Sequence, residues 1–277
     1  MKFCEVFIHE RMCYDLLWRL KIITIPHFMR RIAIEKKLIF FFERLKLKSS
    51  LNELDRLHAA NLPITRKRFS ASGYIIKHGD RSDFIAILLD GFCYGQKVHS
   101  NGKSQIISLG VPGDTIGLEN LVLQTADYDT RALTEVDVAM VPLVAVQELA
   151  LQRPAIAHAL GIHQAINHSI SREWLFNLGA RDGLTRISHF LCEFAFRMDA
   201  QSPRPDKIYE LPMSQEQIGQ ATGLTAVHVN RMLKMLHAAG LIERSWRNVR
   251  FPSWEKLREI GDFSIDYLHS GQQVKLP

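Results

Sequence analysis

A run of basic and amide side chains without a carboxylate lies near the C-terminal end of the sequence. There is no acidic residue between Glu216 and Glu243. The window between them contains several cations and hydrogen-bonding groups: Thr225, His228, Asn230, Arg231, Lys234 and His237. DNA phosphates would repel a carboxylate, whereas arginine can pair with guanine and asparagine with adenine in the major groove. This composition indicates a surface that contacts DNA.

The residues at the start of this window predict a short helix and a tight turn. Ser214 is a good N-cap, and Gln217 three residues later completes a capping-box pattern. The helix is expected to run to Thr222. Gly223 and Leu224 then form the turn, because glycine readily adopts the left-handed backbone needed at a helix exit.

A second helix is expected directly after this turn. Thr225 can cap it and Gly240 ends it. Apolar residues recur between these ends at helical spacing: Val229, Met232, Leu233 and Leu236. A helix, a glycine turn and a capped helix make the helix-turn-helix pattern. The alternative is a plain helical hairpin whose charges are merely solvated.

The segment 241–251 alternates like a two-stranded hairpin. Its basic residues are Arg244, Arg247 and Arg250. A hairpin beside a helix-turn-helix makes a winged helix, and these arginines are placed to contact phosphates.

The elements upstream must position this winged helix. Residues 154–178 have apolar side chains at helical intervals, predicting one helix of about 25 residues that starts at Pro154 and ends near Gly179. So long a helix offers more apolar surface than one small domain covers, so we interpret it as a dimer seam rather than only a core helix. The predicted seam residues are Leu160, Ile166, Ile170 and Trp174. A second helix is expected at 183–200, then a loop at 202–206 and a short strand at 207–211.

Residues 64–142 have a different pattern, with short apolar runs separated by turn residues. Asn101-Gly102 is a hairpin signal, and Val136–Val141 is expected to be the closing strand. Strands at this spacing predict a β-sandwich or jelly-roll domain.

Length and composition fit a two-domain globular chain. The chain has 277 residues, of which 47% are hydrophobic and 23% charged. No apolar run approaches the roughly 20 residues of a membrane-spanning helix. We therefore expect no membrane partner. The dispersed cysteines fit reduced thiols in a cytoplasmic protein; they are Cys4, Cys13, Cys93 and Cys192.

The net charge of +6 is located in the first 48 residues. The basic pI is therefore weak support for DNA binding. The prediction of DNA binding depends instead on the local pattern at 217–242. The expected organisation is a basic extension at 1–48, a β-roll sensory domain at 49–153, a dimerisation helix at 154–179 and a winged helix-turn-helix domain at 180–270. The fold class is α+β.

The stretch from Leu211 to Ile242 resembles the DNA-binding end of the CRP/FNR superfamily of bacterial transcription regulators. The similarity continues upstream in turn motifs of that family's cyclic-nucleotide-binding-like β-roll and at the end of its dimerisation helix: Gly79-Asp80, Leu89-Asp90-Gly91, Asn101-Gly102, Pro112-Gly113-Asp114 and 171–179. The resemblance implies a non-enzymatic homodimer that binds a palindromic operator in double-stranded DNA, with RNA polymerase as a further partner of an activator.

The resemblance also implies roles for particular residues. Those expected to contact DNA in the helix-turn-helix are Gln215, Thr225, Ala226, His228, Asn230, Arg231 and Lys234. Thr225 would cap the second helix near a phosphate, and Arg231 is the best candidate for a two-bond contact with guanine. Ala226-Val227 stands where nucleotide-responsive members usually have Arg-Glu, so we expect a different operator.

The familiar inputs of this family do not fit the sequence. Cyclic nucleotide binders place an arginine on the cyclic phosphate, but here only Arg131 is available, beside Asp127 and Asp129. Four cysteines hold the iron–sulfur cluster of oxygen-sensing members, but Cys4 and Cys13 are the only pair near the N-terminus. We therefore expect no cofactor and no metal, and the identity of any small-molecule effector stays open.

A metal-dependent, cupin-like β-barrel with an accessory helical domain is the alternative from another class. It would need converging ligands on its strands, and His78 and His99 alone fall short.

Overall fold

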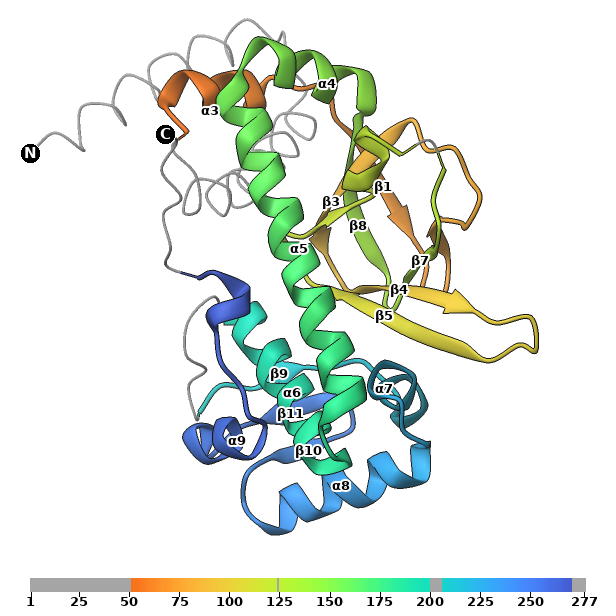
Figure 1. Ribbon diagram of the computed structural model, residues 1–277, viewed down its shortest axis with the longest axis vertical. Helices are drawn as coiled ribbons and strands as arrows, with labels where there is room; N and C mark the ends of the chain where they lie inside the picture. Colours follow the sequence, from red (N-terminus) through yellow and green to blue (C-terminus); the bar gives the residue numbers. More distant parts are fainter. Residues whose placement is uncertain (1–50, 124, 200–205, 271–277) are drawn as a thin grey trace, which may run out of the picture.

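The computed structural model describes residues 51–123, 125–199 and 206–270. The predictions for residues 1–48, and for most of the loop at 202–206, lie outside this part of the chain. Figure 1 shows a β-domain on one side of a long helix and a mainly helical domain at the far end of that helix. The predicted α+β architecture is confirmed.

The β-domain consists of two antiparallel four-stranded sheets. Their orders are β1-β8-β3-β6 and β2-β7-β4-β5. The strands are β1 (Thr65–Phe69), β2 (Tyr74–Ile76), β3 (Phe84–Asp90), β4 (Cys93–Val98), β5 (Ser104–Gly110), β6 (Thr115–Ile116), β7 (Asp129–Ala132) and β8 (Val136–Pro142). Strands β4 and β5 form the predicted hairpin, in which Gly102 has a φ of 84°. That backbone region is open to glycine at little steric cost.

Alternation along β3 gives the β-domain two apolar faces. Ala86 and Leu88 pack toward the second sheet, while Ile85, Ile87 and Leu89 pack toward helices. Because side chains alternate between the faces of a strand, one continuous apolar run packs against the second sheet on one face and against the helices on the other. The helices on the outer face are α3 (Glu53–Ala60), α4 (Leu143–Gln152) and the start of α5 (Pro154–Ala180), with the 3₁₀ turn η1 (Leu118–Leu121) beside them.

Helix α4 was not predicted from the sequence. Its N-cap, Pro142, makes no side-chain capping bond, and the helix contains no acidic residue in its first turn. The usual start signals are therefore missing. Val146 and Leu149 instead hold the helix against the β-domain by burial.

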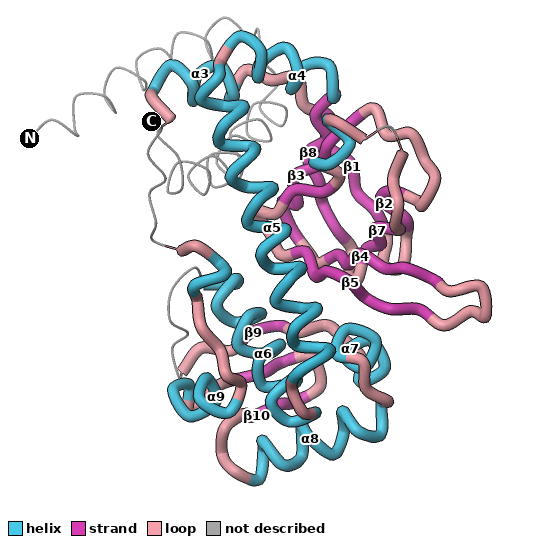
Figure 2. Tube along the Cα trace, in the orientation of Figure 1, coloured by secondary structure: helices cyan, strands magenta, loops and turns pink. Residues whose placement is uncertain are grey.

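Helix α5 begins at the predicted residue and ends at Ala180, one residue beyond the predicted Gly179. Pro154 lies in its first turn, where the missing N–H of proline removes no helical hydrogen bond. Figure 2 shows the helix running from the β-domain to the C-terminal domain without interruption. Helix α5 therefore links the β-domain to the C-terminal domain.

The C-terminal domain surrounds helix α6 (Gly183–Asp199). Its other elements are β9 (Tyr209–Glu210), α7 (Gln215–Thr222), α8 (Ala226–Ala238), β10 (Glu243–Ser245), β11 (Asn248–Arg250), α9 (Trp254–Ile260) and the 3₁₀ turn η2 (Asp266–Leu268). The strands form a small antiparallel sheet in the order β10-β11-β9. Strand β9 is shorter than the predicted 207–211, because only its two residues pair with β11.

The C-terminal domain and one sheet of the β-domain share a core. Five buried side chains from the β4–β5 region lie in the same apolar cluster as α6, α7 and α8: Phe92, Tyr94, Ile106, Leu109 and Val111. The rings of Phe92 and Phe194 are 6.1 Å apart. The two domains are therefore packed together and not merely tethered.

Candidate DNA-binding interface

Helix α7 begins with the predicted capping box. The Gln217 N–H donates to Ser214 Oγ at 3.1 Å, and the Ser214 N–H donates to Gln217 Oε1 at 2.9 Å. Gly223 ends the helix with a φ of 66°. A Cβ on Gly219 would lie 2.4 Å from the carbonyl oxygen of Leu224, so this glycine permits the close turn.

Helix α8 presents an apolar face inward and a mainly polar face outward, on which Val227 and Met235 are also exposed. Thr225 caps it by accepting the His228 N–H at 3.3 Å. The predicted apolar residues are all buried: Val229, Met232, Leu233 and Leu236. Burial of these side chains anchors α8 against the domain and fixes which residues face away from it.

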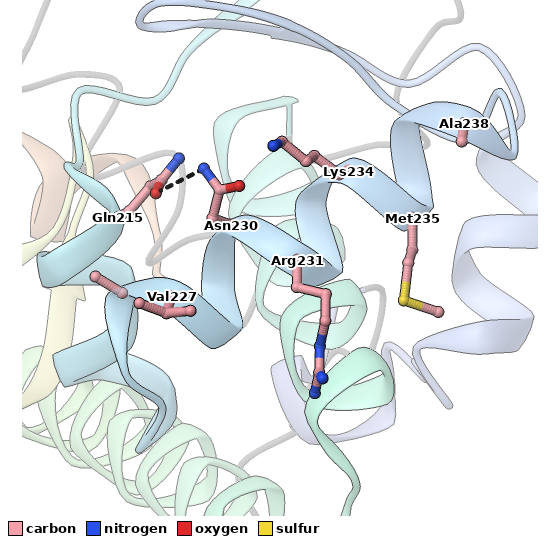
Figure 3. Close-up of a pocket in the computed structure, with 8 residues that line it drawn as sticks. Gln215, Val227, Asn230, Arg231, Lys234, Met235 and Ala238 are labelled. Atoms are coloured by element: carbon pink, nitrogen blue, oxygen red, sulfur yellow. Dashed lines mark hydrogen bonds between the residues drawn. The ribbon is translucent and has the colours of Figure 1, made fainter.

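The outward face of α8 has the composition predicted from the sequence. Thr225, Ala226, His228, Arg231 and Lys234 are exposed. Figure 3 shows Arg231 and Lys234 extending away from the helix axis. Among the described residues, neither has a hydrogen-bond or ion-pair partner, so both cations are available to a phosphate or base edge.

Two residues on this surface are already paired with each other. The Asn230 side-chain amide donates to Gln215 Oε1 at 3.1 Å (Figure 3). The bond joins the first turn of α7 to the middle of α8. It fixes the orientation of the Asn230 amide, which is a prerequisite for reading a base edge.

The hairpin predicted at 241–251 is present, but its three arginines differ in their surroundings. Arg244 donates to the Met213 carbonyl at 2.8 Å, and burial lowers the pKa of its guanidinium. Arg250 is paired with Glu243 across the hairpin. Arg247 is exposed, and its guanidinium lies 4.6 Å from the centre of the Trp246 ring. Arg244 and Arg250 have structural partners within the chain, which leaves Arg247 as the wing arginine most available to DNA.

The seam residues predicted on α5 pack within their own chain. Leu160 belongs to the core against β3 and α4, and Trp174 packs edge-on against Phe190 at 5.9 Å. Ile166 is only 6% exposed, and Ile170 packs against the core of the C-terminal domain. Apolar periodicity marked the face of α5 that the chain itself covers. It could not separate burial within a chain from burial between chains.

Another face of α5 is exposed along most of its length. Its members recur every three or four residues: Gly161, Ala165, His168, Arg172, Leu175 and Gly179. Leu175 is 71% exposed, and the neighbouring Phe176 is 52% exposed. The small residues Gly161, Ala165 and Gly179 leave room for a second helix to approach, and Leu175 offers it apolar surface.

The region of the β-domain that resembles a nucleotide cassette is held by internal contacts. Asp129 accepts the His78 N–H at 2.8 Å, and Tyr128 donates to Glu119 Oε1 at 2.8 Å. Arg131 is half-buried, donates to the Ser72 carbonyl at 2.8 Å and lies over the Tyr74 ring. This arrangement agrees with the expectation that Arg131 does not serve a cyclic phosphate, which stays a prediction.

A chain of charged and polar groups crosses the boundary between the domains. Arg197 of α6 donates to Asp114 Oδ2 of the β-domain at 2.6 Å and to Glu193 Oε1 at 3.3 Å. The Glu193 carboxylate also accepts the Trp174 Nε1–H at 3.0 Å and the Tyr267 hydroxyl at 2.9 Å. We call these five residues the interdomain polar network. Glu193 is 2% exposed, so these partners replace the water that would otherwise solvate its carboxylate.

His189 extends the network toward the C-terminal end of α9. Its Nδ1 donates to the Gly261 carbonyl at 3.1 Å, while its Nε2 lies 3.3 Å from the Tyr267 hydroxyl. Burial lowers the pKa of His189, because the charged imidazolium is poorly solvated there. Sequence patterns did not reveal this network, since Asp114 and Arg197 are 83 positions apart.

The structure also describes two of the four cysteines and the residues that could bind a metal. Cys93 and Cys192 are free and buried, and burial raises the pKa of the Cys93 thiol to about 12. Cys4 and Cys13 lie outside the described residues. In the described part of the chain, no three His, Cys, Asp or Glu side chains form a metal-binding group. No helix in that same part is long and apolar enough to span a bilayer.

Each of the two domains matches the model of a known protein family. Residues 66–153 match the model of the cyclic nucleotide-binding domain, and residues 185–260 match that of the Crp-like helix-turn-helix domain. Over 203 residues the chain is 26% identical to the transcriptional activator protein FnrL of Cereibacter sphaeroides, covering 72% of this chain and 81% of that protein. It is 24% identical to a probable transcriptional activator of Rhizobium leguminosarum bv. viciae, covering 77% and 85% respectively.

A solved structure shows the same fold. FixK2 from Bradyrhizobium japonicum superposes with a TM-score of 0.67 at 22% identity, covering 73% of this chain and all of that one. The β-roll, long helix and winged helix-turn-helix thus define a DNA-binding transcription regulator. The chain belongs to the CRP/FNR superfamily.

Proposed function

We propose that this regulator acts as a homodimer that places one α8 helix in each of two major grooves of a palindromic operator. The observation that carries the proposal is the exposed, acid-free face of α8, with Arg231 and Lys234 extending from it. Two helices related by a two-fold axis would read half-sites about one helical turn apart, roughly 34 Å.

The proposed roles follow from exposure and chemistry. Arg231 would read a guanine, and Lys234 would contact a phosphate. Thr225 and Gln215 lie at the first turns of α8 and α7, where helix N-termini favour phosphate. The other proposed contacts on this surface are Ala226, His228 and Asn230.

The dimer axis is assigned to the exposed face of α5. Leu175 is the large apolar side chain most exposed on that helix, and an exposed apolar face on a long helix is a usual site of association. This assignment replaces the seam of Leu160, Ile166, Ile170 and Trp174. An activating role, as the names of the two relatives suggest, would add RNA polymerase as a partner.

Selection of duplex DNA from a random pool tests the proposed function. The full chain should enrich a site with two-fold symmetry and half-site centres about 34 Å apart. The selection should be run with and without cell extract, so that dependence on a small-molecule effector is seen as a change in enrichment. An asymmetric site, or no enrichment under either condition, would contradict the proposal.

Replacing Arg231 with alanine is expected to weaken binding to the selected duplex by about 1–3 kcal/mol and to relax specificity at one base pair. Arg247→Ala should weaken binding to all sequences alike and lower the salt dependence by about one phosphate contact. Fluorescence anisotropy at several salt concentrations measures both effects.

A control for the lost charge is Arg68→Ala. Arg68 lies on β1 and is 68% exposed, 3.9 Å from Glu135. This variant should bind like the parent. Equal losses from Arg231→Ala and Arg68→Ala would show that only net charge matters, and would remove the base-reading role.

A further inference from the structure

The tip of the wing consists of two residues, Trp246 and Arg247. Ser245 pairs with Asn248 at the end of the β10–β11 hairpin, which leaves only these two in the turn. Trp246 has a φ of 52°. A positive φ at the first turn position is usually supplied by glycine, because a side chain there crowds the backbone.

The Trp246 side chain makes no contribution to the apolar core. It is 80% exposed, and its ring contact among the described residues is with the Arg247 guanidinium. By contrast, the nearby Trp254 is 6% exposed and packs against Phe251 and Phe263. An indole in water on a strained backbone lowers stability, and such outliers concentrate at functional sites.

The wing tip is fixed beside the start of the helix-turn-helix. The Arg247 carbonyl accepts the Leu211 N–H at 2.7 Å, and Arg244 donates to the Met213 carbonyl at 2.8 Å. Met213 directly precedes Ser214, the cap of α7. Helix N-termini favour phosphate, so the wing tip lies beside a second point that a DNA backbone can contact.

The charge at the tip favours a DNA backbone as its partner. The Glu243 carboxylate is paired with Arg250, which leaves Arg244 and Arg247 as the net positive groups of the hairpin. Arg244 is half-buried and bonded to the Met213 carbonyl, so Arg247 is the exposed cation. An indole and a guanidinium stacked together offer an apolar plane and a phosphate ligand at the same point. Apolar side chains contact base steps in the minor groove, and aromatic side chains stack on nucleic-acid bases.

On the basis of the proposed function, we propose that Trp246 is a DNA-contacting residue. Its indole packs against the sugar edge of the minor groove flanking each half-site, while Arg247 holds the adjacent phosphate. The contact adds affinity that depends on the flanking base pairs and not on the bases read by α8.

The test uses three variants of the full chain: Trp246→Gly, Trp246→Phe and Arg231→Ala. The first removes the indole and relieves the backbone, the second keeps an aromatic plane, and the third reports base reading by α8. Each is measured for thermal stability and for affinity toward two probes. One probe is the duplex selected from a random pool, and the other is the same duplex trimmed to end at its half-sites.

Trp246→Gly is expected to raise Tm by about 2–4 °C and to weaken binding to the long duplex about tenfold, with an unchanged salt slope. Trp246→Phe should recover most of the affinity. On the trimmed duplex the parent and the glycine variant should bind alike.

Parental affinity in Trp246→Gly, alongside weak binding by Arg231→Ala, would overturn the role of Trp246 and leave the proposed function intact. A lower Tm in the glycine variant would also overturn it, since the indole would then support the fold. Failure of the parent chain to enrich any duplex would overturn both proposals.

Discussion

Replacing Leu175 with glutamate is expected to produce a folded monomer whose affinity for the full operator is at least a hundredfold lower. Leu175 is 71% exposed on the free face of α5, so the carboxylate remains solvated within a protomer. In a symmetric dimer that carboxylate would face its own copy, placing two like charges in an apolar contact. Linking two half-site contacts through a dimer contributes about 10²- to 10⁴-fold in avidity, which the monomer loses.

Sedimentation and binding to one-half-site and two-half-site duplexes measure this effect. Leu151→Glu is the matched control, because Leu151 is 83% exposed and belongs to α4, not to the exposed face of α5. The control should remain a dimer with parental affinity. A dimer of unchanged strength in Leu175→Glu would place the interface elsewhere. Ile166→Glu is unsuitable as a test of the seam, because burying a carboxylate there would destabilise the protomer itself.

Replacing Arg197 with methionine is expected to lower the free energy of unfolding by about 3–5 kcal/mol. Methionine keeps much of the length of the side chain but removes the cation between Asp114 and Glu193. Glu193 would retain its bonds from Trp174 and Tyr267, yet its buried charge would lack a counter-ion. Removing one member of a buried ion pair lowers stability by more than the pair contributes, because the other charge stays buried without a partner.

Urea denaturation followed by circular dichroism provides the measurement. The exposed pair of Arg68 and Glu135 is the reference, and Arg68→Ala should change stability by no more than about 1 kcal/mol. The double variant Arg197→Met with Asp114→Asn should cost less than the sum of its single changes, since the two residues are in contact. Additive losses, or a change in Arg197→Met as small as the reference, would show that the pair does not couple the domains.

Local chemistry made the DNA-binding surface predictable from the sequence. The capping box at Ser214, the glycine at 223 and the cap at Thr225 each act within a few residues, and all three are present in the structure. The apolar repeat of α8 likewise predicted which side faces inward. Short-range patterns of this kind specify both where a helix lies and which residues it exposes.

Features that depend on distant partners were not predictable in the same way. Nothing near Arg197 indicates Asp114 as its partner, and nothing near Trp174 indicates Glu193. Helix α4 lacks capping signals and is stabilised by tertiary packing. The role proposed for Trp246 was also not predicted, because it rests on a backbone angle and an exposure that composition does not report.

The apolar side chains that β4 and β5 contribute to the C-terminal domain have a thermal consequence. Any motion that moved α6 away from this sheet would expose Ile106 and Leu109, now 0% and 4% exposed, to water. Hydration of apolar surface increases heat capacity, so the free energy of such an opening is a curved function of temperature. Cooling below the temperature of maximum stability weakens the apolar contact, and heating favours the opened state because of its greater conformational entropy. The packing of the C-terminal domain against the β4–β5 sheet is therefore most stable over a limited range of temperature. This dependence on temperature needs no bound effector.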